Sequence, residues 1–214
     1  MNNKSYKLKN IKPVLLHEFG HLFGYCLANK NDETFFCMPI EIGLGYKNFI
    51  TPSKKIYHIE NFMQDREQVF ENTKNIKRTI AWFIEVISGC DFETEYEKTN
   101  FDFCFSSNSK CSGSLDFGNL SVIRNISFFK WSFAHIFALQ DSYRKLLLEH
   151  NIYIHVNEIT EEFLKEYGEK DFHIIEKDEL QKYIEKFNNL ISEELNKSYL
   201  KLIEEFEKIL SDDR

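Results

Sequence analysis

The sequence predicts a mainly α-helical protein with a small β-sheet or ribbon, an α+β fold organised as a single domain. Three observations support this prediction: a length of 214 residues, a composition that is 43% hydrophobic and 15% aromatic, and only 8 Gly and 3 Pro. The length fits one domain, and the apolar content is enough for a substantial core. The scarcity of Gly and Pro disfavours all-β designs, which need many tight turns.

The first half of the chain predicts a helix, a small sheet and a second helix. Apolar residues at helical spacing predict the first helix over residues 12–28, with Pro13 in its first turn. The second helix is expected over residues 66–88, with Gly89 as the residue that ends it, followed by an irregular segment over residues 90–113. Between the two helices, β-like runs interrupted by Gly and Pro cover residues 34–42, 45–50 and 55–60.

The second half of the chain predicts helices only. A helical stretch is expected over residues 116–149, with a break near residue 125 or 140, and a further helix is expected from residue 160 to a turn at Gly168. Apolar steps of three and four over residues 178–210 predict a long amphipathic helix or a helical hairpin. We therefore divide the single domain into a core, residues 1–150, and a helical extension packed on it, residues 151–214. Self-association through the C-terminal helix is the alternative use of that apolar stripe.

Charge and composition exclude several classes of protein. The 27 Lys and Arg against 34 Asp and Glu give a net charge of −7, which disfavours nucleic-acid binding. The sequence contains no apolar run long enough for a membrane-spanning helix, and its N-terminus lacks the pattern of a secretory signal. The five Cys form no CxxC pair, which is typical of reduced thiols, so we expect a cytoplasmic protein.

The first predicted helix contains the most informative motif, His17-Glu18-Phe19-Gly20-His21. Residues four apart lie on one face of a helix, so His17 and His21 can bind the same metal ion. Glu18 is offset around the helix, where its carboxylate can act as the general base for a zinc-activated water. This HExxH pattern predicts a zinc-dependent hydrolase with a zincin-like active-site helix and one Zn²⁺ per chain.

A catalytic zinc site needs a third protein ligand, and the residue pattern alone does not choose it. The sequence after His21 contains no nearby His, which excludes the extended metzincin pattern. Several histidines and acidic residues elsewhere in the chain remain candidates: His58, His135, His150, His155, His173, Glu85, Glu93, Glu95 and Asp116.

The order of motifs resembles the peptidase domain of the FtsH-type zinc metalloproteases, peptidase family M41. That family has HEAGH on a helix, a β segment similar to P-R-G-x-A-L-G, a helix that ends in G-G-R-x-A-E, and T-G-A-x-N-D-L at the start of another helix. The present chain has the HExxH motif, then Met-Pro-Ile-Glu-Ile-Gly-Leu-Gly-Tyr over residues 38–46. Ile-Ser-Gly-Cys-Asp-Phe-Glu follows over residues 87–93, and Cys-Ser-Gly-Ser-Leu-Asp-Phe over residues 111–117. The resemblance covers residues 13–149.

The resemblance implies that Asp116 is the third zinc ligand and that Glu93 orients a ligand histidine. Four positions depart from the family pattern: Ile40, Cys90, Phe92 and Leu115. The sequence also contains no P-loop pattern. The resemblance therefore implies a stand-alone peptidase domain without the family's ATPase and membrane anchor, which is ATP-independent on its own.

We expect a zinc metalloendopeptidase that acts on peptides or unfolded proteins, alone or with a separate ATPase or adaptor partner. Two alternatives stay open: a catalytically idle, zinc-stabilised binding or regulatory module, and another HExxH zinc hydrolase with a different third ligand. The β-like run over residues 34–42 suggests that a peptide substrate is aligned by pairing with a strand edge.

Overall fold

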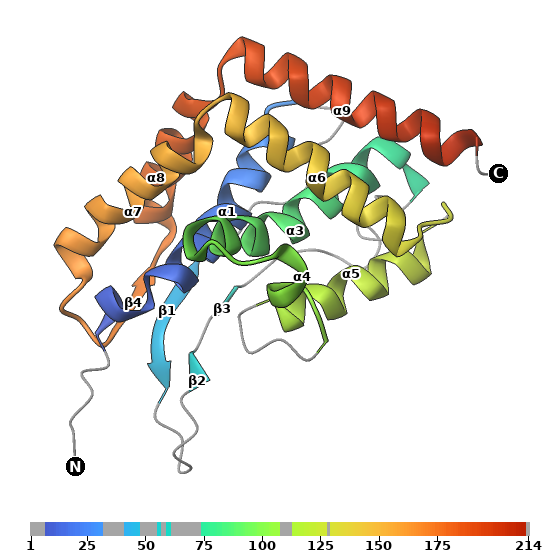
Figure 1. Ribbon diagram of the computed structural model, residues 1–214. Coiled ribbons are helices and arrows are strands. Elements are labelled where there is room, and N and C mark those ends of the chain that lie inside the picture. Colours follow the sequence, from blue (N-terminus) through green and yellow to red (C-terminus); the bar gives the residue numbers. More distant parts are fainter. Residues whose placement is uncertain are drawn as a thin grey trace.

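The computed structural model describes residues 7–31, 41–47, 55–56, 59–60, 74–107, 113–127 and 129–212. These parts are mainly helical with a small antiparallel sheet (Figure 1), which confirms the predicted fold class at this level. The strands are β1 (Ile42–Lys47), β2 (Lys55–Ile56), β3 (Ile59–Glu60) and β4 (Phe172–Ile175). The helices are η1 (Leu8–Ile11, a 3-10 helix), α1 (Lys12–Asn29), α3 (Ile76–Glu97), α4 (Phe101–Cys104), α5 (Ser114–Ile126), α6 (Phe133–Glu149), α7 (Ile152–Tyr167), α8 (Lys177–Leu190) and α9 (Glu193–Asp212).

Helix α1 lies at the centre of the molecule and is buried on all sides. Every residue from Val14 to Ala28 is buried, and α3, α7 and α8 pack around the helix. A helix that is apolar around its whole circumference can be accommodated only in the interior. Its polar residues His17, Glu18 and His21 are therefore buried as well, and they need polar partners from the surrounding elements.

Small residues let α1 and α3 approach each other closely. A Cβ atom on Gly20 would lie 2.8 Å from the carbonyl oxygen of Ser88, and one on Gly24 would lie 2.9 Å from Ser88 Oγ. Neither position has room for a side chain, so glycine is required for this helix pair. The close contact places the HExxH turn of α1 directly against the middle of α3.

The sheet joins the C-terminal part of the chain to the core. Strand β1 pairs antiparallel with β4, with Ile42 opposite Ile175 and Gly45 opposite Phe172, and it also pairs with β2 and β3. Strand β4 was not predicted, because its four residues lie between two strongly helical segments. Residues 32–40, which include most of the proposed peptide-aligning run, lie outside the described residues.

Helix α3 corrects two predictions. It runs through Gly89 and ends at Glu97, so Gly89 does not end the helix and residues 90–97 are not irregular. The helix continues because Cys90 and Phe92 are buried and extend its apolar side, and Lys98 then closes it in the left-handed conformation. Helix α4 adds a short helical turn within the segment expected to be irregular. Residues 61–73, where the predicted helix begins, lie outside the described part of the chain.

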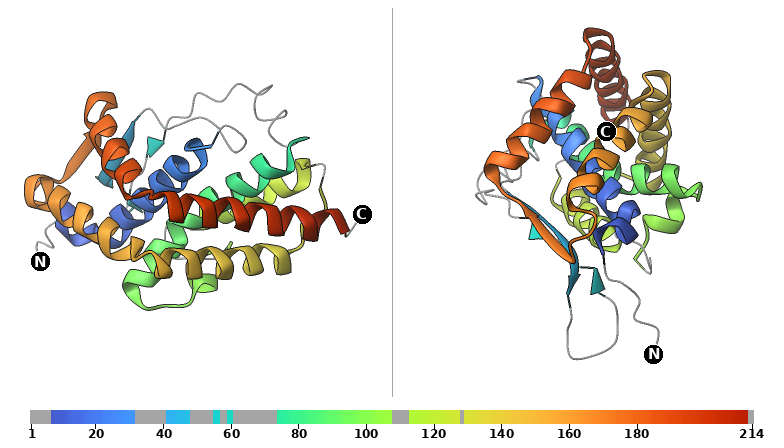
Figure 2. Two further views of the ribbon diagram at one scale, coloured as in Figure 1. Left: turned by 90° about the horizontal axis from the view of Figure 1, so that it is seen from above. Right: turned by 90° about the vertical axis from the view of Figure 1, so that its left-hand side faces the viewer.

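The C-terminal helices follow the prediction except for the start of α7. The predicted break near residue 125 is confirmed, because α5 ends at Ile126 and α6 begins at Phe133, with a capping box between Ser132 and His135. Helix α7 starts at Ile152 instead of residue 160. The last segment forms two helices that pack on different partners, α8 on α1 and α7, and α9 on α3 and α6 (Figure 2). Among the described residues, no helix combines the length and apolarity needed to cross a membrane.

Candidate metal centre

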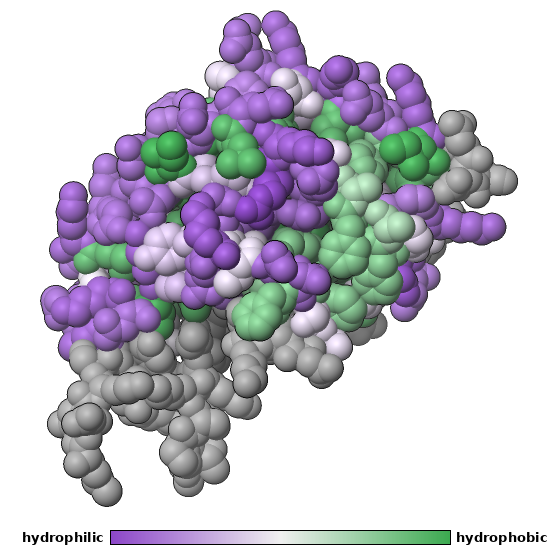
Figure 3. All heavy atoms as spheres, viewed as in Figure 1, coloured by the Kyte–Doolittle hydropathy of each residue, from purple (hydrophilic) through white to green (hydrophobic). Residues whose placement is uncertain are grey.

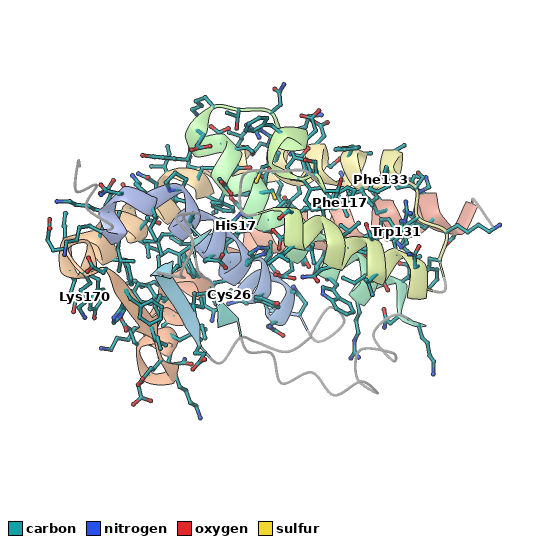
Figure 4. The ribbon with its side chains drawn as sticks, turned by 90° about the horizontal axis from the view of Figure 1, so that it is seen from below. His17, Cys26, Phe117, Trp131, Phe133 and Lys170 are labelled. Atoms are coloured by element: carbon teal, nitrogen blue, oxygen red, sulfur yellow. The ribbon has the colours of Figure 1, made fainter. Side chains whose placement is uncertain are left out.

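Two histidines on α1 and one aspartate on α5 converge in the interior of the protein. His17 and His21 are 1% and 4% exposed, and their Nε2 atoms lie 3.1 Å apart. Asp116 Oδ2 lies 2.9 Å from His17 Nε2 and 3.5 Å from His21 Nε2. Figure 4 shows His17 on α1 close to the beginning of α5, where Phe117 follows Asp116. The fold thus brings together residues that are about one hundred positions apart in the sequence.

The start of α5 determines where the Asp116 carboxylate lies. The helix begins at Ser114, so Asp116 belongs to its first turn, where the helix dipole favours a negative charge. Its side chain is 13% exposed, whereas those of His17 and His21 are nearly inaccessible. Of the three residues, Asp116 is therefore the most exposed. On the face shown in Figure 3, hydrophobic side chains gather over α5 and α6. Leu115, which precedes Asp116, is 73% exposed.

Helix α3 supplies the hydrogen-bond partners of Nδ1, the outer nitrogen of each imidazole. His17 Nδ1 lies 2.9 Å from Glu93 Oε2. His21 Nδ1 lies 2.9 Å from the carbonyl oxygen of Glu85 and 3.0 Å from its Oε1. Because all of these oxygens are acceptors, Nδ1 of each ring acts as the donor, and Nε2 of each ring faces Asp116. This arrangement is the usual one for histidines that bind a metal.

The Asp116 carboxylate, facing the two Nε2 atoms in a buried place, favours a positive charge at this point. Burial by itself would lower the pKa of His17 and of His21, but the neighbouring Asp116 carboxylate outweighs this and raises both pKa values well above 6.5. For Asp116, burial would raise the pKa, and the two imidazoles lower it below its ordinary value. Either protons or a metal cation can satisfy this cluster.

The geometry of the cluster fits a zinc ion. Zinc bonds of about 2.0–2.2 Å to nitrogen and oxygen place the ligand atoms of a tetrahedral site roughly 3.3 Å apart. The observed separations of 3.1, 2.9 and 3.5 Å lie around this value. Only glycine fits on α3 next to the imidazoles, since a Cβ atom on Gly89 would lie 2.3 Å from His21 Nε2 and 2.7 Å from His17 Nε2. The absence of a side chain at Gly89 thus lets α3 form one wall of the cluster.

Glu18, the predicted general base, follows His17 on α1 and is 2% exposed. It follows His17 directly, about 100° around the helix. Glu93, predicted to orient a ligand histidine, lies on α3 and contacts His17, although the sequence did not indicate that it belongs to a helix.

Apart from His58, the other candidates for the third ligand lie in the described part of the chain and have partners or positions away from the shared centre. His155 pairs with Glu158, and His173 pairs with Glu179 and stacks on Tyr167. His135 caps α6, and Glu95 pairs with Arg144. Glu85 contacts His21 Nδ1 instead of the shared centre. The remaining candidates are His150, at the end of α6, and His58, which lies outside the described residues.

Sequence reasoning did not find the thiol pair next to the cluster. Cys104 Sγ lies 3.3 Å from Cys90 Sγ and 3.3 Å from Glu93 Oε2, and Cys90 Sγ lies 3.9 Å from Asp116 Oδ2. The only signal in the sequence was that Cys90 replaces the arginine of the family motif. No pattern linked it to Cys104, because the segment between them was expected to be irregular.

Comparison with protein-family models gives no match, and neither the curated proteins nor the solved structures contain a match to this chain.

Proposed function

We propose that this protein is a zinc-dependent metallopeptidase in which His17, His21 and Asp116 hold the metal and Glu18 is the general base. The observation that supports the proposal is the convergence of two Nε2 atoms and one carboxylate oxygen at separations that suit zinc. A chance HExxH motif would not require an acidic partner from a distant helix at the same point. Nor would it require acceptors at both Nδ1 atoms.

The protein's own groups have distinct tasks in peptide hydrolysis. His17, His21 and Asp116 would hold a zinc ion, which would supply Lewis acidity toward the peptide carbonyl and the attacking water. Glu18 would accept the proton of the water and donate it to the nitrogen of the leaving amine. Glu93 and Glu85 keep the two imidazole rings oriented by accepting their Nδ1 protons. Burial of His17, His21 and Glu18 keeps competing water away from these groups.

The similarity to peptidase family M41 is part of the proposal. Asp116 and Glu93, the two residues that the resemblance assigns, are the ones that meet His17 in the structure. We propose a relative of this peptidase domain with a zincin-like active site that acts without an ATPase of its own. Its substrates would be peptides or unfolded segments, supplied directly or by a separate ATPase or adaptor.

One observation favours a second candidate, a catalytically idle module stabilised by zinc. Glu18 is only 2% exposed, and the two histidines are similarly buried, as in a closed structural zinc site. In such a module zinc would stabilise the fold and no peptide bond would be cleaved.

Zinc content and peptide cleavage, measured on the same preparations, separate these functions. We expect one zinc per chain in the wild type and in Glu18→Gln, and loss of zinc in Asp116→Ala. Asp102→Ala, at an exposed acidic residue of α4, is the matched control and should retain zinc. Cleavage of an unfolded protein such as casein should be abolished in Glu18→Gln. Full zinc occupancy of Asp116→Ala would refute the ligand assignment, and absence of cleavage by the zinc-loaded wild type would favour the idle module.

A further inference from the structure

The two buried thiols beside the metal centre are close enough to react with each other. Cys90, in the middle of α3, and Cys104, at the end of α4, have no exposed surface, and their sulfur atoms lie 3.3 Å apart. A disulfide requires the two sulfurs to approach to about 2 Å, a movement of little more than 1 Å. Only small oxidants can reach a buried pair of this kind. Asp116, whose side chain is 13% exposed, has its carboxylate 3.9 Å from Cys90 Sγ.

We propose that Cys90 and Cys104 form an oxidation site for hydroperoxides and that the resulting disulfide weakens metal binding. One thiol gives up its proton, and its sulfur attacks an oxygen of hydrogen peroxide; the O–O bond breaks, the leaving hydroxide takes up the proton, and a sulfenic acid and water are formed. The second sulfur then attacks the sulfenic sulfur, the S–O bond breaks, and a second water leaves. The two sulfurs together lose two electrons, which reduce hydrogen peroxide to two molecules of water.

Two contacts connect the thiol pair to the metal centre. The Cys104 thiol donates to Glu93 Oε2, the same oxygen that accepts from His17 Nδ1. Disulfide formation removes this donor and shifts its sulfur. In addition, Gly113 lies directly against both cysteines, because a Cβ atom there would be 2.2 Å from Cys90 Sγ and 2.7 Å from the carbonyl oxygen of Cys104.

Movement of the sulfurs therefore acts on Gly113, the residue directly before α5. Gly113 is three positions before Asp116, so a shift at Gly113 moves the carboxylate relative to the two imidazoles. Metal sites tolerate ligand displacements of only about 0.2 Å. The effect on zinc rests on the proposed function, whereas formation of the disulfide does not.

The test treats the full-length protein, with and without zinc, with hydrogen peroxide, then blocks free thiols and digests with trypsin without reduction. Each of the five cysteines falls in its own tryptic peptide, so mass spectrometry identifies every pairing. The peptides are residues 10–30, 31–47, 79–98, 99–110 and 111–124. We expect 79–98 joined to 99–110, and a zinc affinity at least about tenfold weaker than in the reduced protein. A phosphine reductant should restore the affinity.

Two variants serve as controls. In Cys104→Ser, peroxide should leave zinc affinity unchanged relative to the same variant before treatment. Cys26→Ser, which removes a buried thiol near Ile184 on α8, should respond as the wild type does.

The two parts of the proposal fail in different ways. Absence of the joined peptide, or joining of 99–110 to 111–124 instead, would overturn the oxidation site. A joined peptide with unchanged zinc affinity would overturn the coupling. A reduced protein that binds no zinc would refute the proposed function, while the peptide map would still decide whether the thiols react.

Discussion

Replacing Gly89 by alanine would place a methyl group between the two imidazoles without changing any residue that could bind the metal. The new carbon would lie 2.3 Å from His21 Nε2, 2.7 Å from His17 Nε2 and 2.8 Å from His17 Cδ2. Normal contacts of this kind are about 3.5 Å long, so His21 Nε2 would have to move by about 1 Å. Because zinc sites tolerate about 0.2 Å, at least one nitrogen would leave the coordination sphere.

The expected loss of zinc affinity is about a hundredfold or more. Changes to residues that merely orient ligands cost about 10- to 100-fold, and here the ligands themselves are displaced. A hundredfold change corresponds to about 2.7 kcal/mol of binding free energy. The free energy of unfolding without metal should change less, because overpacking costs about 1–3 kcal/mol while alanine gains up to about 1 kcal/mol in helix propensity.

Gly118→Ala is the matched control, because Gly118 is also a helical glycine and a Cβ atom there would have no neighbour within 4 Å. It should bind zinc as the wild type does and be stabilised by up to about 1 kcal/mol. Zinc affinity would be measured by competition with a chromophoric chelator, and unfolding by urea titration with the metal removed. Wild-type zinc affinity in Gly89→Ala, with helix content preserved, would refute the assignment of the two Nε2 atoms to the metal.

Three further outcomes are expected. Glu93→Gln should weaken zinc binding about tenfold, because His17 loses its charged partner. Glu95→Gln, whose carboxylate pairs with Arg144, should bind zinc as the wild type does. Equal zinc affinities of the two variants in the chelator competition would contradict the role of Glu93 in orienting His17. Because the pKa values of His17 and His21 are raised well above 6.5, zinc should displace protons on binding, and its apparent affinity should rise about tenfold per pH unit for each proton displaced. Calorimetry in buffers of different ionisation heat would detect these protons, and an affinity independent of pH between 6 and 8 would be inconsistent with them. Burial raises the pKa of Asp91 from 3.8 to about 6, so the native state binds its proton more tightly than the unfolded chain does. Protonated Asp91 should therefore add about 3 kcal/mol to the free energy of unfolding below pH 3.8, and this contribution should disappear as the pH rises through 6. In Asp91→Asn, urea titrations should show no such decrease in the free energy of unfolding.

Local patterns predicted some helices well and others poorly. Helix α1 was predicted within a residue or so, because Pro13 and a continuous apolar run define it whatever the tertiary context. The predicted end of the second helix at Gly89 was wrong. From a single sequence, a glycine that permits close packing cannot be distinguished from a glycine that ends a helix. Strand β4 was missed because four residues carry little periodicity, and only its pairing with β1 defines it.

The sequence by itself determined that two histidines lie together on the central helix of this protein. The i, i+4 spacing places His17 and His21 on one face of a helix whatever surrounds it, and the apolar character of that helix predicts its burial. Residue type and spacing left Asp116, Glu93, Glu85 and the histidines outside the motif equivalent, and within the sequence only the family resemblance pointed to Asp116; the contact itself depends on the tertiary structure. The packing of α1 against α3 and α5 brought Asp116 to the shared centre and put Glu93 and Glu85 at the outer nitrogens. The same packing set Cys90 beside Cys104, since contacts between distant segments depend on how whole helices fit together, which no local pattern encodes.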